Sequence, residues 1–169
     1  RVSTPPPTAL VHAATASANS GRSLLRTDPK TAMLSFSTVG SARHPNVDKV
    51  TYALAGLKAE APDLSVDGEL QFDAAFTPSV GERKSPGSTV AGQASVMIFP
   101  NLDAGNIGYK ITQRLGGYAA IGPILQGLAQ PANDLLRGCS AEAVPEMIAV
   151  TTLQSPYSTS PTKGPQTPT

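Results

Sequence analysis

Apolar residues occur along the chain in short runs separated by proline, glycine and polar residues, and their spacing predicts alternating helices and strands. Residues 10–26 are rich in alanine and serine, which favours a helix, and residues 32–36 form an apolar run of strand length. We expect a second helix between Asn46, which can cap it, and Pro62, which ends it. Its apolar stripe consists of Val47, Val50, Leu54 and Leu57.

The second half of the chain continues the alternation. Residues 64–68 and 94–100 have the character of strands, and residues 103–115 that of a helix capped by Asp103 and ended by two glycines. Residues 118–125 form another apolar run, which we expect to be a buried strand, and residues 140–153 a last helix capped by Ser140. Repeated β–α alternation predicts an α/β fold with a mainly parallel sheet and helices on both faces.

The two ends of the chain have a different composition from the rest. Residues 1–8 and 155–169 are rich in proline, serine and threonine and carry few large apolar side chains. Such segments bury too little apolar surface to offset the entropy of ordering, so we expect both to be flexible. The rest of the 169 residues suffices for about one domain.

Composition and charge argue against several kinds of partner. The net charge is +1, aromatic residues make up 5 % and tryptophan is absent, so the chain lacks the basic surface and stacking residues of a nucleic-acid binder. No apolar run approaches the ~18 residues of a membrane span. We therefore expect neither a nucleic acid nor a membrane as partner. The single cysteine, Cys139, excludes an internal disulfide and fits a reducing compartment, with the cytoplasm as default.

Metal ligands and catalytic nucleophiles have little support. His12 and His44 are the only histidines, so a Cys/His zinc set is excluded. We interpret both as surface residues. Cys139 lies just before an expected helix, whose dipole would lower its pKa, but no histidine is close in sequence to act as base. We therefore interpret it as a structural cysteine.

Three stretches combine polar side chains with strand-to-helix junctions. Residues 67–75 place several acids in a turn that follows an expected strand, and residues 101–110 combine glycines with Lys110 at a helix start. Residues 133–140 place Arg137 before a helix N-terminus, which suits a phosphate. These residues indicate an anion-binding α/β domain. A surface loop and close helix packing remain alternative interpretations of them.

Taken together, these motifs resemble, in order and spacing, the phosphate acetyltransferase (phosphotransacetylase) family. The stretches that carry the resemblance are Val66-Asp67-Gly68-Glu69-Leu70-Gln71-Phe72, Ile98-Phe99-Pro100-Asn101-Leu102, Gly105-Asn106-Ile107-Gly108-Tyr109-Lys110, Gly122-Pro123-Ile124-Leu125-Gln126-Gly127 and Arg137-Gly138-Cys139-Ser140. The resemblance implies the interconversion of acetyl-CoA and phosphate with acetyl phosphate and CoA. It implies an isocitrate-dehydrogenase-like fold of two lobes, with CoA and phosphate as substrates and no tightly bound cofactor.

The resemblance also implies functional residues. Arg137 would hold phosphate and stabilise charge in the transition state, which makes it the expected catalytic residue. The implied substrate-binding residues are Asn106, Tyr109, Lys110, Arg137, Gly138 and Ser140. In the family a serine precedes this arginine and an aspartate, the base for the CoA thiol, follows six residues later. Here these positions hold Leu136 and Ala143.

The resemblance finally implies a division of the chain. Family catalytic domains are about twice as long, so residues 9–126 would form the second lobe and residues 127–154 would return to a first lobe. We therefore expect a truncated phosphate acetyltransferase that forms a homo-oligomer or associates with a partner supplying the first lobe. The alternative is a non-catalytic module of this family that binds acyl-CoA or phosphate or assists assembly.

Overall fold

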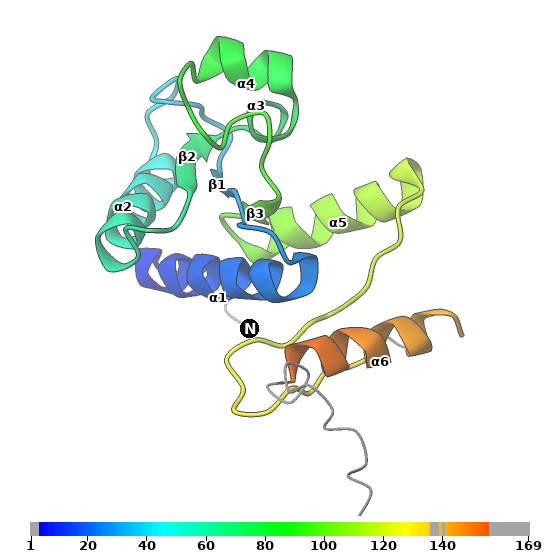
Figure 1. The fold of residues 1–169 in the computed structure, drawn as a ribbon. Helices are drawn as coiled ribbons and strands as arrows, with labels where there is room; N and C mark the ends of the chain where they lie inside the picture. The colour runs from blue at the N-terminus through cyan, green and yellow to red at the C-terminus, as the bar shows by residue number, and fades with distance from the viewer. Residues whose placement is uncertain (1–3, 136–138, 140, 156–169) are drawn as a thin grey trace, which may run out of the picture. The chain divides into compact units, whose positions relative to one another are not determined.

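The computed structural model describes residues 4–135, 139 and 141–155 of the chain (Figure 1). These residues divide into two compact units, one up to Ala120 and one from Ile121 onward. The sequence had suggested a division after residue 126. The elements, in chain order, are α1 (Pro7–Leu25), β1 (Thr31–Leu34), α2 (Pro45–Glu60), β2 (Val66–Leu70), α3 (Phe72–Phe76), α4 (Pro78–Lys84), β3 (Val96–Ile98), α5 (Leu102–Gly116) and α6 (Ala143–Gln154).

The three strands form one parallel sheet in the order β2-β1-β3, with β1 in the centre. Thr31 pairs with Val66 on one side and with Val96 on the other. This confirms the α/β fold with a parallel sheet that the alternation predicted. Helices cover both faces, as Figure 1 shows: α1 and α2 lie on one side of the sheet, and α3 and α4 on the other.

Strand alternation explains the two apolar clusters. Met33 points to the face under α1 and α2, whereas Ala32 and Leu34 point to the face under α3, because successive side chains of a strand project to opposite sides. The buried residues of the α1/α2 cluster are Leu10, Val11, Ala14, Met33, Val50, Ala53, Leu54, Leu57 and Ile98. Those of the α3 cluster are Ala32, Leu34, Leu70, Ala74, Ala75, Val90 and Ala91.

The α1 and α2 helices begin differently from the sequence prediction. α1 starts at Pro7, inside the segment expected to be flexible, with proline in its first turn, where its missing N–H costs nothing. The cap of α2 is His44 rather than Asn46: His44 Nδ1 accepts a hydrogen bond of 3.1 Å from the Asn46 backbone N–H. His44 therefore has a structural role, and Asn46 is a residue of the helix.

The β2 strand contains a bulge that changes which acids lie in a turn. Gly68 pairs with Met33 and Leu70 with Leu34, so Glu69 is an extra residue on β2. A Cβ at Gly68 would lie 2.7 Å from the Met33 Cβ, which explains glycine at this close approach. Asp67 and Glu69, expected in a turn, therefore belong to the strand.

The two short helices α3 and α4 were not expected. They have five and seven residues, too few for a helical period to be visible in the sequence. α4 lies directly against the segment that leads to β3. The contact is so close that a Cβ built at Gly81 would lie 2.5 Å from the Gly92 nitrogen. Small residues on both sides permit this contact.

The expected strand at residues 118–125 is wrong. These residues form no helix or strand, and Tyr118 and Leu125 are 65 % and 44 % exposed. In the second unit, Asn133 accepts a hydrogen bond from the Leu125 N–H and donates to the side chains of Thr151 and Gln154. α6 begins at Ala143 with Glu142 in the cap position, whereas Ser140, the expected cap, lies outside the described residues.

Candidate functional site

The loops that follow the three strands lie at one edge of the sheet, because all three strands are parallel. Residues 35–44 follow β1, residue 71 follows β2, and residues 99–101 follow β3. Ligands of α/β proteins bind at the carboxyl ends of the strands, where neighbouring connections leave in opposite directions. With β1 between β2 and β3, this carboxyl edge is where a ligand site is expected.

A buried carboxylate organises the loop after β1. Glu69 is 4 % exposed and accepts hydrogen bonds of 2.8 Å from Ser37 Oγ and 2.8 Å from the Gly40 N–H. Ser37 Oγ also accepts from the Ala42 N–H at 3.0 Å, and the Thr38 N–H donates to Ser41 Oγ at 3.0 Å. The bulge on β2 therefore directs a carboxylate into the loop and fixes the turn formed by residues 37–42.

The backbone of this turn is strained at one residue. Val39 has φ 47° and Gly40 φ 76°, both in the left-handed region. Glycine adopts this conformation freely, whereas a β-branched residue rarely does. The Val39 N–H donates to the Glu69 carbonyl oxygen at 3.1 Å, and the Val39 side chain is 61 % exposed. The surrounding hydrogen bonds therefore maintain a conformation that Val39 itself disfavours.

A second polar group joins the end of β2 to α4. Lys84 Nζ donates to Gln71 Oε1 at 2.8 Å and to Asp73 Oδ2 at 2.9 Å, and Gln71 Nε2 donates to the Phe36 carbonyl oxygen. The hydrogen bond from Lys84 lowers the pKa of Asp73 below its ordinary value. The loops after β1 and β2 are thus joined by side-chain contacts.

The third loop is joined to α2. Lys49 Nζ donates to the Pro100 carbonyl oxygen at 2.7 Å. The next residue, Asn101, caps α5 by accepting the Ala104 N–H at 2.8 Å, so Asp103, the cap expected from sequence, lies inside the helix. Phe99 lies against the glycine side of α5, with 3.0 Å between its ring and a Cβ built at Gly108.

Three of the expected substrate-binding residues lie together on α5. Asn106, Tyr109 and Lys110 share one side of the helix because they are three and four residues apart. All three are exposed, and Lys110 Nζ lies 5.2 Å from the centre of the Tyr109 ring. The described residues therefore bring half of the predicted set onto one helix face, which begins at the carboxyl edge.

The other predicted site residues lie outside the described residues. These are Arg137, Gly138 and Ser140, together with Leu136, one of the two departures from the family pattern. Ala143, the second departure, is the first residue of α6. Cys139 is described and is a free, exposed thiol.

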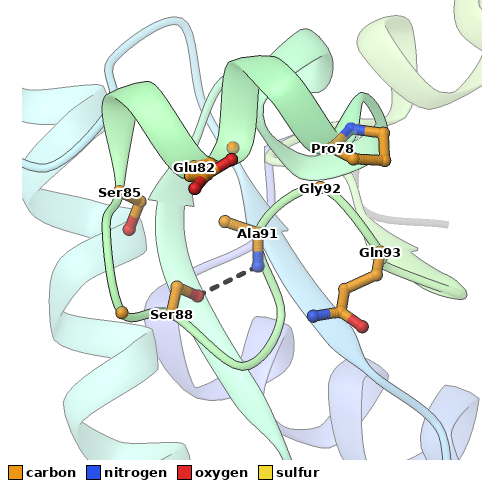
Figure 2. Close-up of a pocket in the computed structure, with 9 residues that line it drawn as sticks. Pro78, Glu82, Ser85, Ser88, Ala91, Gly92 and Gln93 are labelled. Carbon is orange, nitrogen blue, oxygen red and sulfur yellow. Dashed lines mark hydrogen bonds between the residues drawn. The ribbon is translucent and has the colours of Figure 1, made fainter.

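A hollow of about 350 Å³ lies between α4 and the chain after it, as Figure 2 shows. Glu82 is the one ionisable residue in its lining, and Ser88 Oγ within it accepts the Ala91 N–H at 2.9 Å. The lining of this hollow lacks the basic side chains that provide charge-assisted hydrogen bonds to an anion. The carboxyl edge, with Lys49 and Lys84, and the face of α5 that carries Lys110 are the better candidates.

The described residues show neither a metal-binding cluster nor a membrane-spanning helix. No group of three or more His, Cys, Asp or Glu residues there is arranged to hold a metal ion. Within the same ranges, no helix combines the length and apolarity that a membrane span requires.

Sequence reasoning missed the network of Ser37 and Glu69, although the serines of residues 35–41 after an apolar run were a usable signal.

Comparison with known proteins gives one consistent result. A family model described as "Phosphate acetyl/butaryl transferase" matches residues 2–152. Over 146 residues, the chain is 53 % identical to a phosphate acetyltransferase of Bacillus subtilis. This match covers 86 % of the chain and 45 % of that protein. A Thermoanaerobacterium thermosaccharolyticum phosphate acetyltransferase is 54 % identical, with 44 % of its length covered. The chain thus spans about half the length of the curated relatives it matches.

Solved structures agree with the sequence matches. The EutD phosphotransacetylase of Staphylococcus aureus superposes with a TM-score of 0.83 at 52 % identity, over 91 % of this chain and 48 % of that one. A Streptococcus pyogenes phosphotransacetylase gives a TM-score of 0.84 at 52 % identity, over 89 % of this chain and 45 % of that one. The similarity therefore extends over both sequence and fold.

Proposed function

Because the chain belongs to the phosphate acetyl/butaryl transferase family, we propose that it is part of a phosphate acetyltransferase. In this reaction a phosphate oxygen attacks the thioester carbon of acetyl-CoA and the C–S bond breaks. The proton of the attacking hydrogen phosphate passes to the leaving sulfur, so that acetyl phosphate and the CoA thiol are released. The observation that carries the proposal is the 53 % identity over 146 residues to a phosphate acetyltransferase. The match spans about half of the length of these relatives.

The proposed roles follow the charge that develops in the reaction. Attack on the thioester creates a tetrahedral oxyanion beside a phosphate, which requires fixed positive donors. Arg137 is the proposed catalytic residue because its planar guanidinium can donate to both groups. Asn106, Tyr109 and Lys110 would bind substrate from the exposed face of α5, with Gly138 and Ser140 beside Arg137.

The remaining parts of the proposal concern partners. CoA would be a substrate rather than a resident cofactor, and a second copy or a polypeptide supplying the first lobe would complete the site. A single cysteine, which cannot form an internal disulfide, supports a cytoplasmic location.

The direct test measures CoA release from acetyl-CoA and phosphate at pH 7. The 169-residue chain is assayed alone and with a polypeptide carrying the part of the Bacillus subtilis relative that this chain does not match. We expect little release from the chain alone and a low rate from the mixture. Ala143→Asp should raise that rate by about 10²–10⁴-fold, the usual contribution of general acid–base catalysis, because in this direction the carboxyl group would protonate the leaving thiolate.

Two controls decide the outcome. Arg137→Ala in the mixture should abolish the phosphate-dependent release of CoA, whereas a change of the exposed Tyr52 on α2 should leave it unchanged. Absence of phosphate-dependent release in every mixture, including the one with Ala143→Asp, would contradict an enzymatic function.

A non-catalytic module is the alternative. It is favoured by the apolar residues Leu136 and Ala143 at positions where the family has a serine and the base. Such a module would bind CoA or phosphate in the mixture yet show no turnover, even with Ala143→Asp. Calorimetry with CoA, run beside the activity assay, separates the two functions.

A further inference from the structure

The residues on both sides of Arg43 are held by hydrogen bonds at the carboxyl edge. The Ala42 N–H before it donates to Ser37 Oγ at 3.0 Å. After it, His44 caps α2 and places its ring edge-on to Phe36, with 5.6 Å between ring centres. The hydrogen bonds of its neighbours therefore hold the backbone of Arg43 in place, although the residue is exposed.

The buried Glu69 carboxylate is what fixes this loop. The ion pairs found among the described residues join Arg22 to Asp28 and Lys84 to Asp73, so neither Glu69 nor Arg43 takes part in one there. A buried carboxylate without a cationic partner is costly unless several donors satisfy it. Here the donors are Ser37 Oγ and the Gly40 N–H, both from the loop itself. These two hydrogen bonds offset the cost of burying the carboxylate, and they order the turn.

The exposed guanidinium is the group that this loop offers to an anion. The backbone N–H groups of residues 37–42 already donate to acceptors within the loop or on Glu69. A ligand at this turn would therefore be bound by a side chain rather than by these N–H groups. Arginine has five donors in a planar arrangement that matches two phosphate oxygens.

We propose that Arg43 binds a phosphate group of the substrates and that Glu69 is its positioning residue, acting through the turn of residues 37–42. This proposal rests on the proposed function, whose substrates, CoA and inorganic phosphate, both carry phosphate. Arg43 lies after the central strand and so at the edge where a ligand between neighbouring strands would lie.

The test measures ligand affinity by NMR titration of the ¹⁵N-labelled full chain, with inorganic phosphate in one series and CoA in another. Arg43→Gln should weaken binding about tenfold or more, because a charge-assisted hydrogen bond is lost. Arg43→Lys should recover part of the affinity. Arg22→Gln, an exposed arginine on α1, is the matched control and should bind as the wild type does.

The positioning role of Glu69 has its own variants. Glu69→Ala should weaken binding as much as Arg43→Gln, whereas Glu69→Gln retains an acceptor for Gly40 and should stay close to the wild type. Leu54→Ala serves as a control that loses stability in the α1/α2 cluster without touching the loop, and its affinity should not change. Denaturant unfolding of each variant verifies that it is folded.

The outcomes are distinguishable. A loss confined to the phosphate series assigns Arg43 to inorganic phosphate, and a loss confined to the CoA series assigns it to a phosphate of CoA. Unchanged binding by Arg43→Gln overturns the inference and leaves the proposed function standing. An effect of Glu69→Ala no larger than that of Leu54→Ala overturns the positioning role. A wild type that binds neither ligand overturns the inference, whereas the proposed function is decided by CoA release in the mixture.

Discussion

The face of the sheet under α1 and α2 and the carboxyl edge of the same sheet are held together in different ways. The face is an apolar cluster in which Ala53 and Leu57 are fully buried. The edge is a set of hydrogen bonds centred on Ser37, Glu69 and Lys84, around a turn with a strained valine. Apolar burial depends little on direction, whereas hydrogen bonds require specific geometry. The first region therefore determines mainly stability and the second mainly the shape of the candidate site.

The largest expected effect lies in the apolar face. Leu57→Ala removes a fully buried side chain and should lower the free energy of unfolding by about 2–5 kcal/mol. Urea unfolding followed by circular dichroism measures the change. Tyr52→Ala, on the same helix but 71 % exposed, is the control and should change stability by less than about 0.5 kcal/mol. Equal effects of the two would show that α2 is not packed as described.

The next largest effect on stability is expected at the carboxyl edge of the sheet. Ser37→Ala leaves the Ala42 N–H without its acceptor and Glu69 without one of its two donors, at a cost of about 1–3 kcal/mol. The NMR signal of the Gly40 amide should also shift, while signals from α1 stay in place. A loss of stability with unchanged signals from residues 37–42 would argue against a turn shaped by these bonds.

The strained valine gives a smaller effect of opposite sign. Val39→Asn should raise the free energy of unfolding by about 0.5–1 kcal/mol, because asparagine tolerates the left-handed region better and the lost side chain is mostly exposed. Val39→Ile keeps the branch at Cβ and should give no gain. A stabilising Val39→Ile would mean that packing rather than backbone strain decides at this residue.

The smallest effect depends on pH. Lys84 lowers the pKa of Asp73 in the folded chain, so the pair stabilises the fold above the unfolded pKa of about 4 and loses this contribution as the pH falls through the lower folded value. Both side chains are partly exposed, so the contribution is at most about 0.2–1 kcal/mol. Asp73→Asn should flatten the acid side of a stability–pH curve, and 1 M salt should have a similar effect on the wild type. An unchanged curve would contradict the pair.

Sequence patterns predicted the features that depend on the regular spacing of apolar residues. The stripe Val47, Val50, Leu54 and Leu57 is buried in α2, and the alternation of strands and helices gave the parallel sheet. The prediction of a strand at residues 118–125 was wrong because an apolar run forms a strand only where a neighbouring strand pairs with it. Its residues have no hydrogen-bonded neighbour strand among the described residues.

The candidate site depends on features that leave little trace in a pattern. Glu69 reaches the loop because one extra residue is inserted in β2, and a bulge cannot be recognised from alternation over five residues. His44 rather than Asn46 caps α2. Either side chain can accept a backbone N–H, and the cap is His44 because Pro45 occupies the first position of the helix. Asn106, Tyr109 and Lys110, by contrast, were brought to one helix face by their spacing alone.

The central place of β1 has a consequence for the time course of folding during synthesis. Thr31 pairs with Val66 and Val96, so β1 must wait for about 35 further residues for its first neighbour and about 65 for its second. At ~5–20 residues per second on a bacterial or eukaryotic ribosome, the second wait lasts roughly 3–13 s. Throughout it, one edge of the most buried strand has no neighbour to pair with. The nascent chain is therefore exposed to aggregation and to chaperones until residue 96 has been made.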